Sequence, residues 1–385
     1  MINLAVVGLG KFGRRHVDTA IASGRFRVVR AVVRTIGPAR EYAAARDIRL
    51  STDLAEALED PRVDAVSLVT PHRLHVPQVI QAAEAGKHVL AEKPFALTAA
   101  DAEKAVSACA RAGVVVAVGH DNRFYPAIRE IKRLLDAGAL GTIIHAEANL
   151  SHDLMLKAIG KALAVTAGSV EACGAGGTST QATTGAWRFD PSEAPVGSMA
   201  HLGVHRIDTF VQLFGRIVQV FALPGRNTLK AAWDDSLSIL LRFAAGMTAY
   251  VGSSLATPLN SRMQIFGSEG WVEATGPRDY QEYLRSSLRT VSVRGADGSF
   301  ETREFDAGDS VMLNFRAFAD AIEQKAPYPV TAGEIVHVPA VLEAITGSLA
   351  SGRAVAVPEP LQREVTSVQP DKPVLEVPGT QEAIS

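Results

Sequence analysis

The stretch INLAVVGLGKFG, residues 2–13, decides how the N-terminal part of this chain folds. Residues 2–7 form a continuous apolar run, which is typical of a strand buried on both faces of a parallel sheet. Gly8, Gly10 and Gly13 follow in a G-x-G-x-x-G pattern, and a helical pattern comes next. A strand, a glycine loop and a helix in this order predict a site for the pyrophosphate of a dinucleotide. The alternative is a glycine turn that binds nothing.

The dinucleotide prediction assigns the residues of this loop to cofactor binding. The glycines permit a tight turn and a close approach of the backbone, and the following helix offers unpaired N–H groups to the phosphates. We therefore expect Gly8, Gly10, Lys11, Phe12 and Gly13 to contact the cofactor.

The end of the second predicted strand indicates which dinucleotide is bound. An acidic residue there would bind the ribose 2′-hydroxyl of NAD and repel a 2′-phosphate. This chain has Arg34 and Thr35 after the apolar run at 27–33, and a guanidinium with a hydroxyl suits a phosphate. The sequence thus favours NADP over NAD, unless Arg34 is an ordinary surface arginine.

Strand and helix patterns alternate through the first third of the chain. Further apolar runs occur at 65–69, 88–91 and 114–118, with helix-length segments at 73–85 and 99–112. This alternation predicts an α/β domain with a doubly wound parallel sheet, the Rossmann architecture, over residues 1–120.

The remainder of the chain has a different pattern of predicted strands and helices. After a helix at 126–137, pairs of strand-like runs joined by short glycine turns occur at 237–253, 264–274 and 291–305. Consecutive hairpins predict an α+β domain with an open, mainly antiparallel sheet over 121–356. Two late helices, at about 309–324 and 332–350, are expected to pack back on the body, and 357–385 to form an extended tail. The weakly patterned loop at 151–185 is expected to be mobile or functional.

The composition narrows the class of partner. The 385 residues are 47% hydrophobic and 21% charged, with a formal net charge of −2, so the basic excess that nucleic-acid binding needs is missing. The apolar runs are too short to span a bilayer, and the chain opens into a strand without signal-peptide regions. Two cysteines, Cys109 and Cys173, fit a reducing cytosol. We expect a cytoplasmic protein with a small-molecule substrate and neither a membrane nor a nucleic-acid partner.

Two short stretches carry candidate chemistry. In HVLAEKPFAL, residues 88–97, Glu92 and Lys93 follow a buried strand. Such a Glu-Lys-Pro is usually a solvated turn, but ligands bind outside the carboxyl ends of parallel strands, where Lys93 stands. In HLGVHRID, residues 201–208, His201 and His205 are four apart and would share one helix face. A histidine pair could bind a metal, but apart from Asp208 no Cys or acidic ligand is near, so we predict none. Asp208 is expected to serve helix packing.

Six motifs together resemble the glucose–fructose oxidoreductase/inositol dehydrogenase family, written Gfo/Idh/MocA. They read VGLGKFGRRH, TPHRLH, AEKPFAL, NRFYPAI, AWRFD and GSMAHLGVHRID, and the resemblance covers roughly residues 2–357. It implies a dinucleotide-binding domain followed by an open antiparallel sheet. It also implies a homodimer or homotetramer built on that sheet.

The resemblance also assigns residues. It implies that Lys93 lies beside the nicotinamide and helps to move the hydroxyl proton, with His205 as its acid/base or hydroxyl-binding partner. At His201 the family usually has an acid, so this departure leaves open both the substrate and the division of labour; we assign His201 a catalytic and substrate-binding role. Further cofactor contacts are expected from Thr70, Pro71, His75 and Glu92. Substrate contacts are expected from Asn122, Arg123, Trp187 and Arg188, with packing or surface positions as the alternative.

These observations lead to one leading hypothesis and two rivals. The leading one is an NAD(P)-dependent oxidoreductase that transfers a hydride between the nicotinamide and a secondary alcohol or ketone of a sugar, inositol, related polyol or hydroxy acid. A lyase or decarboxylase on the same fold, with the cofactor recycled or idle, is the first rival. A non-enzymatic NAD(P) sensor is the second, although a sensor would need neither Lys93 nor His205.

Overall fold

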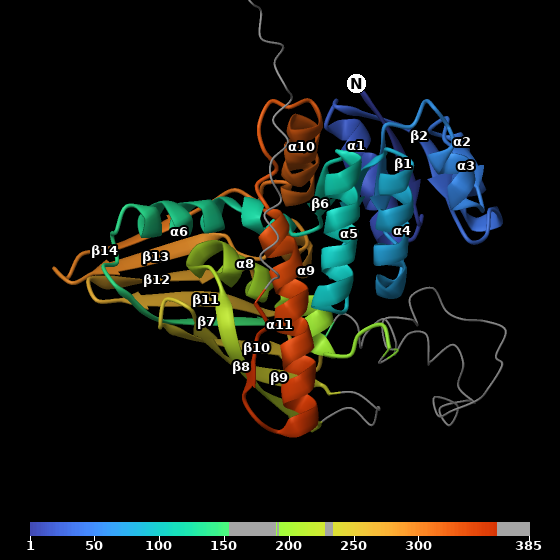
Figure 1. Cartoon of the computed structure of the whole chain (residues 1–385). Coiled ribbons are helices and arrows are strands. Elements are labelled where there is room, and N and C mark those ends of the chain that lie inside the picture. The colour runs from blue at the N-terminus through green and yellow to red at the C-terminus, as the bar shows by residue number, and fades with distance from the viewer. Residues whose placement is uncertain (154–189, 191, 228–233, 360–385) are drawn as a thin grey trace, which may run out of the picture.

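The computed structural model of the protein describes residues 1–153, 190, 192–227 and 234–359, which form two β-sheets with helices packed on them (Figure 1). The strands are β1 (Ile2–Val7), β2 (Phe26–Val32), β3 (Arg49–Ser51), β4 (Ala65–Leu68), β5 (His88–Ala91), β6 (Val116–Val118), β7 (Ile143–Ser151), β8 (Ile217–Gly225), β9 (Ser236–Phe243), β10 (Thr248–Ser254), β11 (Asn260–Gly267), β12 (Gly270–Thr275), β13 (Thr290–Gly295), β14 (Phe300–Glu304) and β15 (Val355–Ala356). The helices are α1 (Lys11–Ala22), α2 (Arg40–Ala44), α3 (Leu54–Leu58), α4 (His72–Glu84), α5 (Ala99–Ala112), α6 (Pro126–Asp136), α8 (Val204–Phe214), α9 (Tyr280–Tyr283), α10 (Ser310–Ile322) and α11 (Ala332–Ser351). Short turns are η1 (Gly37–Ala39), η2 (Asp121–Phe124) and the π-helical turn η4 (Met199–Gly203).

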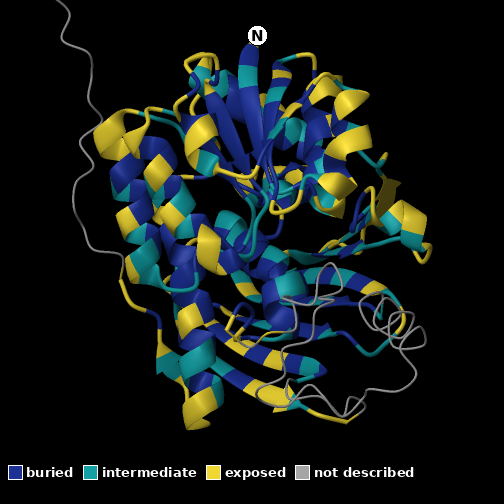
Figure 2. Cartoon of the chain, turned by 90° about the vertical axis from the view of Figure 1, so that its right-hand side faces the viewer, coloured by how far each residue is buried: buried dark blue, intermediate teal, exposed yellow. Residues whose placement is uncertain are grey.

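The first sheet has the order β3-β2-β1-β4-β5-β6, and all its strand pairs are parallel. Its strands are almost entirely buried, as the dark blue strands of Figure 2 show, because helices cover both faces. The Rossmann prediction is therefore confirmed. The short elements β3, α2 and α3 were not predicted, since runs of three to five residues carry little periodicity.

Helix α10 returns from the far end of the chain to complete this first body. Phe315 packs edge-on against Phe26 with 5.5 Å between ring centroids, and Phe318 stacks on Phe26 at 6.1 Å. Arg25 also pairs with Asp320 at 2.9 Å. The late helix thus covers the sheet beside α1.

The second sheet has the order β14-β13-β12-β11-β7-β10-β9-β8-β15. The three predicted hairpins are present as β9–β10, β11–β12 and β13–β14. At the centre lies β7, which was not predicted and pairs parallel with β10 but antiparallel with β11. The sheet is therefore mixed and mostly antiparallel, in agreement with the predicted class.

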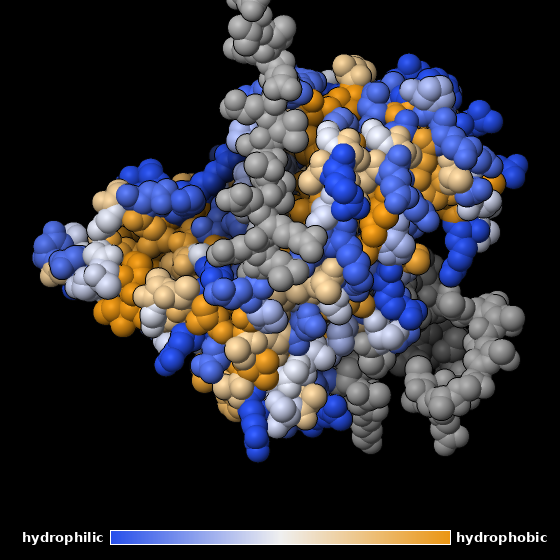
Figure 3. Space-filling view, viewed as in Figure 1, coloured by the Kyte–Doolittle hydropathy of each residue, from blue (hydrophilic) through white to orange (hydrophobic). Residues whose placement is uncertain are grey.

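Helices α6, α8 and α11 cover one face of this second sheet (Figure 1). Ile128, Ile207 and Ile345 from these helices are fully buried against the strands, so most of the core lies on that side. Between α6 and the β13–β14 edge, Leu134, Val291 and Val293 line a hollow, and hydrophobic side chains are visible below α6 in Figure 3. Within the part of the chain that the structure describes, no helix covers the opposite face of the sheet (Figure 1).

The second sheet extends into the region expected to be tail. Strand β15 pairs with β8, and Val357 donates its N–H to the carbonyl oxygen of Val218 at 2.9 Å. Val357, the first residue of the predicted tail, is buried, so this residue still packs with the sheet. None of the described helices is both long and apolar enough to cross a membrane.

Candidate active site

The glycine loop connects β1 to α1 at the carboxyl edge of the first sheet. Gly8 has φ +97°, and a Cβ there would lie 2.4 Å from the carbonyl oxygen of Val69. A Cβ on Gly13 would lie 1.8 Å from the carbonyl oxygen of Gly8. Both positions therefore exclude any larger residue, and the expectation of a tight turn with close helix–strand packing matches this geometry.

Gly10 differs from the other two glycines of the motif. No atom lies within 4 Å of where its Cβ would be, and it begins α1 without a side-chain cap or an acidic residue in the first turn. An open backbone position at an uncapped helix N-terminus is the arrangement that receives a phosphate. The loop thus fits a dinucleotide, with Lys11 and Phe12 beside Gly10 at the start of the helix.

Arg34 and Thr35 lie two and three residues beyond the end of β2 and are both exposed. Their strand is tied to the glycine loop, because the Gly8 N–H donates to the carbonyl oxygen of Val32 at 2.8 Å. This position beside the loop matches the place where a residue can reach the adenosine ribose of a bound dinucleotide.

His75 braces two loops at this edge. Its Nδ1 lies 2.9 Å from the carbonyl oxygen of Pro94 and its Nε2 lies 3.0 Å from that of Thr70. Burial lowers the pKa of His75, so the neutral ring donates to one of the two carbonyls. The ring is fully buried, and its contribution to a cofactor site is to hold the segments around Thr70, Pro71 and Pro94 together.

Glu92 is held by a contact with His16 of helix α1. Its Oε1 lies 3.0 Å from Nε2 of His16, whose Nδ1 lies 2.8 Å from Oγ of Ser67. Burial alone would raise the pKa of Glu92, but the contact with His16 and the charge of Lys93 outweigh it and keep that pKa below its usual value. The Glu92 carboxylate is thus bound by His16, and this contact supports the segment that carries Lys93.

Lys93 reaches from the first sheet to the second body. Its Nζ donates to the backbone carbonyl of His201 at 2.9 Å. Lys93 follows β5, whose carboxyl end lies at the same edge as the glycine loop, because β1, β4 and β5 are neighbouring parallel strands. The ammonium therefore lies between the predicted cofactor loop and the helix that carries the histidines.

The two histidines of HLGVHRID do not occupy a regular α-helix. His201 lies in the π-helical turn η4 and His205 in the first turn of α8, so the expectation of a shared α-helical face is wrong. The His201 ring lies 6.2 Å from the ring of His72, whereas Nδ1 of His205 lies 3.9 Å from Oδ1 of Asp121. Turns of the π type are frequent at functional sites, and this one gives the two rings different neighbours.

His205 is a largely buried, neutral imidazole, with 17% of its side chain exposed. Burial is the main cause that holds its pKa well below the usual value, and the charges of Lys93, His120 and Arg206 act in the same direction. A neutral histidine beside a lysine ammonium can accept a proton from a bound hydroxyl group. Among the described residues, no group of three or more His, Cys, Asp or Glu side chains could hold a metal ion.

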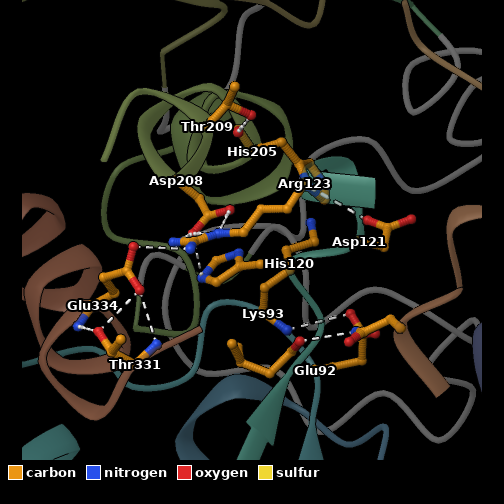
Figure 4. Close-up of polar contacts among 12 residues, drawn as sticks. Glu92, Lys93, His120, Asp121, Arg123, His205, Asp208, Thr209, Thr331 and Glu334 are labelled. Atoms are coloured by element: carbon orange, nitrogen blue, oxygen red, sulfur yellow. Dashed lines mark hydrogen bonds and ion pairs between the residues drawn. The ribbon is translucent and has the colours of Figure 1, made fainter. Parts of the chain in front are cut away.

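Arg123 is part of a buried ion pair. Its Nε and Nη2 make contacts of 3.0, 2.9 and 2.6 Å with the carboxylate of Asp208, and Nη1 donates to Glu334 at 2.9 Å (Figure 4). The whole guanidinium is thus directed at protein carboxylates, and Asn122 beside it is also buried. This geometry makes Arg123 a support for the site rather than a substrate contact. Asp208 is more than a packing residue, because it neutralises that arginine.

Asp121 is a further candidate site residue, which the sequence analysis did not name. It opens η2 directly after β6, between the candidates on β5 and the predicted contacts Asn122 and Arg123. Its place at the carboxyl end of a parallel strand is the signal that could have found it. Trp187 and Arg188, and most of the loop at 151–185, lie outside the described residues.

Comparison with known proteins identifies the family. A sequence model described as the oxidoreductase family with an NAD-binding Rossmann fold matches residues 2–120, and the GFO/IDH/MocA C-terminal domain matches residues 128–273. The chain belongs to the Gfo/Idh/MocA family.

The relatives cover nearly the full chain. D-apiose dehydrogenase of Paraburkholderia graminis is 26% identical over 94% of this chain and 92% of its own length. D-xylose 1-dehydrogenase (NADP(+)) 2 of Haloferax volcanii is 26% identical over 91% of this chain and 98% of its own. The structure of levoglucosan dehydrogenase in complex with NADH and levoglucosan aligns with a TM-score of 0.77 at 21% identity, over 93% of this chain and all of that one. This last likeness confirms the two-domain fold.

Proposed function

We propose that this member of the Gfo/Idh/MocA family is an NAD(P)-dependent oxidoreductase that acts on a secondary alcohol or ketone of a sugar, inositol, related polyol or hydroxy acid. The observation that best supports this activity is the position of Lys93 and His205. The ammonium stands at the carboxyl end of β5, at the same edge of the sheet as the glycine loop, and a neutral, largely buried imidazole approaches from the second body. The relatives support the substrate class, since their names describe dehydrogenases of apiose and xylose.

The chemistry divides between the cofactor and the chain. A bound nicotinamide supplies C4 as the acceptor or donor of the hydride. His205 accepts the hydroxyl proton of the alcohol when the carbon–hydrogen bond breaks, and Lys93 stabilises the developing negative charge on the oxygen. His201 remains our candidate for a substrate contact, because its backbone already holds the lysine.

The exposed position of Arg34 supports NADP as the preferred cofactor. A guanidinium binds a 2′-phosphate through charge-assisted hydrogen bonds, and Thr35 adds a hydroxyl. The relatives include an enzyme named for NADP and one whose structure contains NADH, so the side chain after β2 is the feature that supports the preference.

The open face of the second sheet supports a homo-oligomer. On strands β8, β9 and β14, Leu223, Leu240 and Phe300 are each more than half exposed (53%, 54% and 58%). Phe300 also pairs with Trp271 at 6.1 Å on the neighbouring part of the sheet. Large, exposed apolar side chains on a sheet are typical of protein interfaces, and we propose that a second copy of the chain covers them. We keep the cytoplasm as the proposed location, because Cys109 is a free, buried thiol.

One assay tests the function. The purified protein is incubated with NADP(+) or NAD(+) and a panel of sugars, inositols, polyols and hydroxy acids, and the absorbance of the reduced nicotinamide is followed. We expect net, substrate-dependent reduction of free cofactor for at least one compound. A lyase with a recycled cofactor would convert substrate without net reduction, and that result would overturn the proposal.

A further inference from the structure

Asp121 lies against the proposed base. Its Oδ1 is 3.9 Å from Nδ1 of His205, and its Oδ2 accepts a hydrogen bond from Oγ of Ser310 at 2.7 Å (Figure 4). Ser310 begins α10, the helix that returns to the first body. The carboxylate is thus anchored on one side by the last part of the chain, while its other oxygen is directed at the histidine.

The other two carboxylates close to Lys93 and His205 in Figure 4 are already engaged. Glu92 is held by His16, and Asp208 is held by Arg123 through several contacts. Position 201, where the family pattern usually has an acid, carries a histidine whose ring lies beside His72.

The ring of His205 has a nitrogen, Nδ1, that a carboxylate could bind. Nδ1 of His205 is buried and, among the described residues, has no hydrogen-bond partner. A buried ring nitrogen without a partner costs free energy, unless the contact is completed during the reaction. The 3.9 Å separation is slightly too long for a hydrogen bond, and catalytic contacts of this kind often tighten only when substrate is bound.

We propose that Asp121 is the positioning acid of His205, and that it takes the part which the family pattern assigns to an acid at position 201. This inference rests on the proposed function, since it assigns His205 as the base. Asp121 accepts the Nδ1–H of His205, so that the ring presents an unprotonated Nε2 to the substrate hydroxyl.

The proton and the hydride are both accounted for in this arrangement. A bound nicotinamide would accept the hydride that the substrate carbon loses, while the substrate oxygen loses its proton to Nε2 of His205, so that a carbonyl group forms. The imidazolium that results keeps its Nδ1–H on the Asp121 carboxylate, which balances the new charge. In the reverse direction the same proton returns to the oxygen.

Burial and nearby charges shift the pKa values of Asp121 and His205 in opposite directions. Burial raises the pKa of Asp121, and the nearby Glu92 adds to this, whereas burial and nearby cations lower that of His205. The groups that face Asp121 are Arg15 of α1, Glu92 and Lys93 after β5, His205 of α8, Ser310 of α10, and the phenols of Tyr125 and Tyr283.

The Asp121→Asn variant tests the assignment. An asparagine amide has the same shape but can donate to Nδ1, which places the ring proton on Nε2, the nitrogen required as a base. We expect kcat to fall about 10²- to 10⁴-fold, the range of a positioned acid or base, with KM and cofactor affinity nearly unchanged. The acidic limb of the pH–rate profile should move to lower pH, because the anion that favours the imidazolium is gone. Asp136→Asn, an exposed acid paired with Lys132 on its own helix, is the matched control and should leave all four quantities unchanged.

Two further measurements separate this inference from a structural role and from the proposed function. Formate should restore part of the activity of Asp121→Ala but not of Asp121→Asn, because only the alanine variant leaves space for a carboxylate. The ring nitrogens of ¹⁵N-histidine-labelled protein, with His205→Gln used for assignment, should show Nδ1–H in the wild type and Nε2–H in Asp121→Asn. This tautomer measurement needs no substrate, so an inactive substrate panel with the expected tautomers would overturn the function alone. Unchanged tautomers, or more than half of wild-type turnover in Asp121→Asn, would overturn the assignment of Asp121.

Discussion

The Arg123–Asp208 pair offers the sharpest test of which residues support the site and which act in it. Arg123 and Asp208 are joined by contacts of 2.6, 2.9 and 3.0 Å, and both side chains are almost completely buried. Removing one partner of a buried ion pair leaves the other charge buried and unpaired, which lowers the free energy of unfolding by about 3–5 kcal/mol.

The two single variants are expected to lose different amounts of free energy of unfolding within that range, because different groups remain beside the unpaired charge. In Asp208→Asn the guanidinium keeps Glu334 at 2.9 Å, so we expect a loss in the free energy of unfolding of about 3 kcal/mol. In Arg123→Met the Asp208 carboxylate is left with His120, whose Nε2 lies 3.7 Å away. Burial lowers the pKa of His120, which makes it a poor cation, so a loss of about 4–5 kcal/mol is expected.

The double variant Arg123→Met/Asp208→Leu completes the cycle. With both charges replaced by apolar side chains, no charge is stranded, and the loss should be about 0–2 kcal/mol, far below the sum of the single losses. Urea unfolding followed by fluorescence and by circular dichroism gives the values, provided that both probes report one transition. Lys132→Met, which breaks an exposed pair with Asp136, serves as the control.

A substrate-binding role for Arg123 predicts the opposite pattern. The variant Arg123→Met would then raise KM and leave the free energy of unfolding within about 1 kcal/mol of the wild type, as for an exposed charge. Additive losses in the double variant would equally refute the view that Arg123 and Asp208 act as one unit.

Three further predictions address catalysis, cofactor and pH. Lys93→Met should lower turnover about 10²- to 10⁴-fold while NADPH titration by fluorescence shows nearly unchanged affinity, and turnover above half of wild type would contradict the role of Lys93. Arg34→Asp should abolish a preference for NADPH over NADH of roughly ten- to a hundredfold, which corresponds to about 1.5–3 kcal/mol; equal affinities in the wild type would contradict it. His337 accepts the N–H of Ile217 at 3.0 Å, and burial lowers its pKa to about 4. Because the unfolded state takes up this proton first, stability should fall as pH drops from about 6.5 to about 4, by roughly 3 kcal/mol, and urea unfolding at several pH values should show a shallower fall in His337→Gln.

The sequence determined those features whose physical cause is local. A buried strand, a glycine loop and a helix within residues 2–22 predict the parallel first sheet, and a Cβ at Gly8 or Gly13 would indeed collide with backbone oxygens. The hairpins of the second sheet were predicted because their glycine turns join strands that are adjacent along the chain. Lys93 and His205 were likewise predicted from short motifs.

Tertiary structure decided what depends on pairing between distant segments. Strand β7 lies at the centre of the second sheet because it pairs with β10 and β11, about a hundred residues further along the chain, and no local pattern encodes that choice. Helix α10 covers the first sheet although it is almost the last element of the chain. The sequence suggested Arg123 as a substrate contact, but the folded chain surrounds it with carboxylates from α8 and α11. Asp121 becomes a site residue only because α8 and α10 place His205 and Ser310 on either side of it. Charges and hydrogen bonds act over a few ångströms of space, and distance along the sequence does not measure that separation.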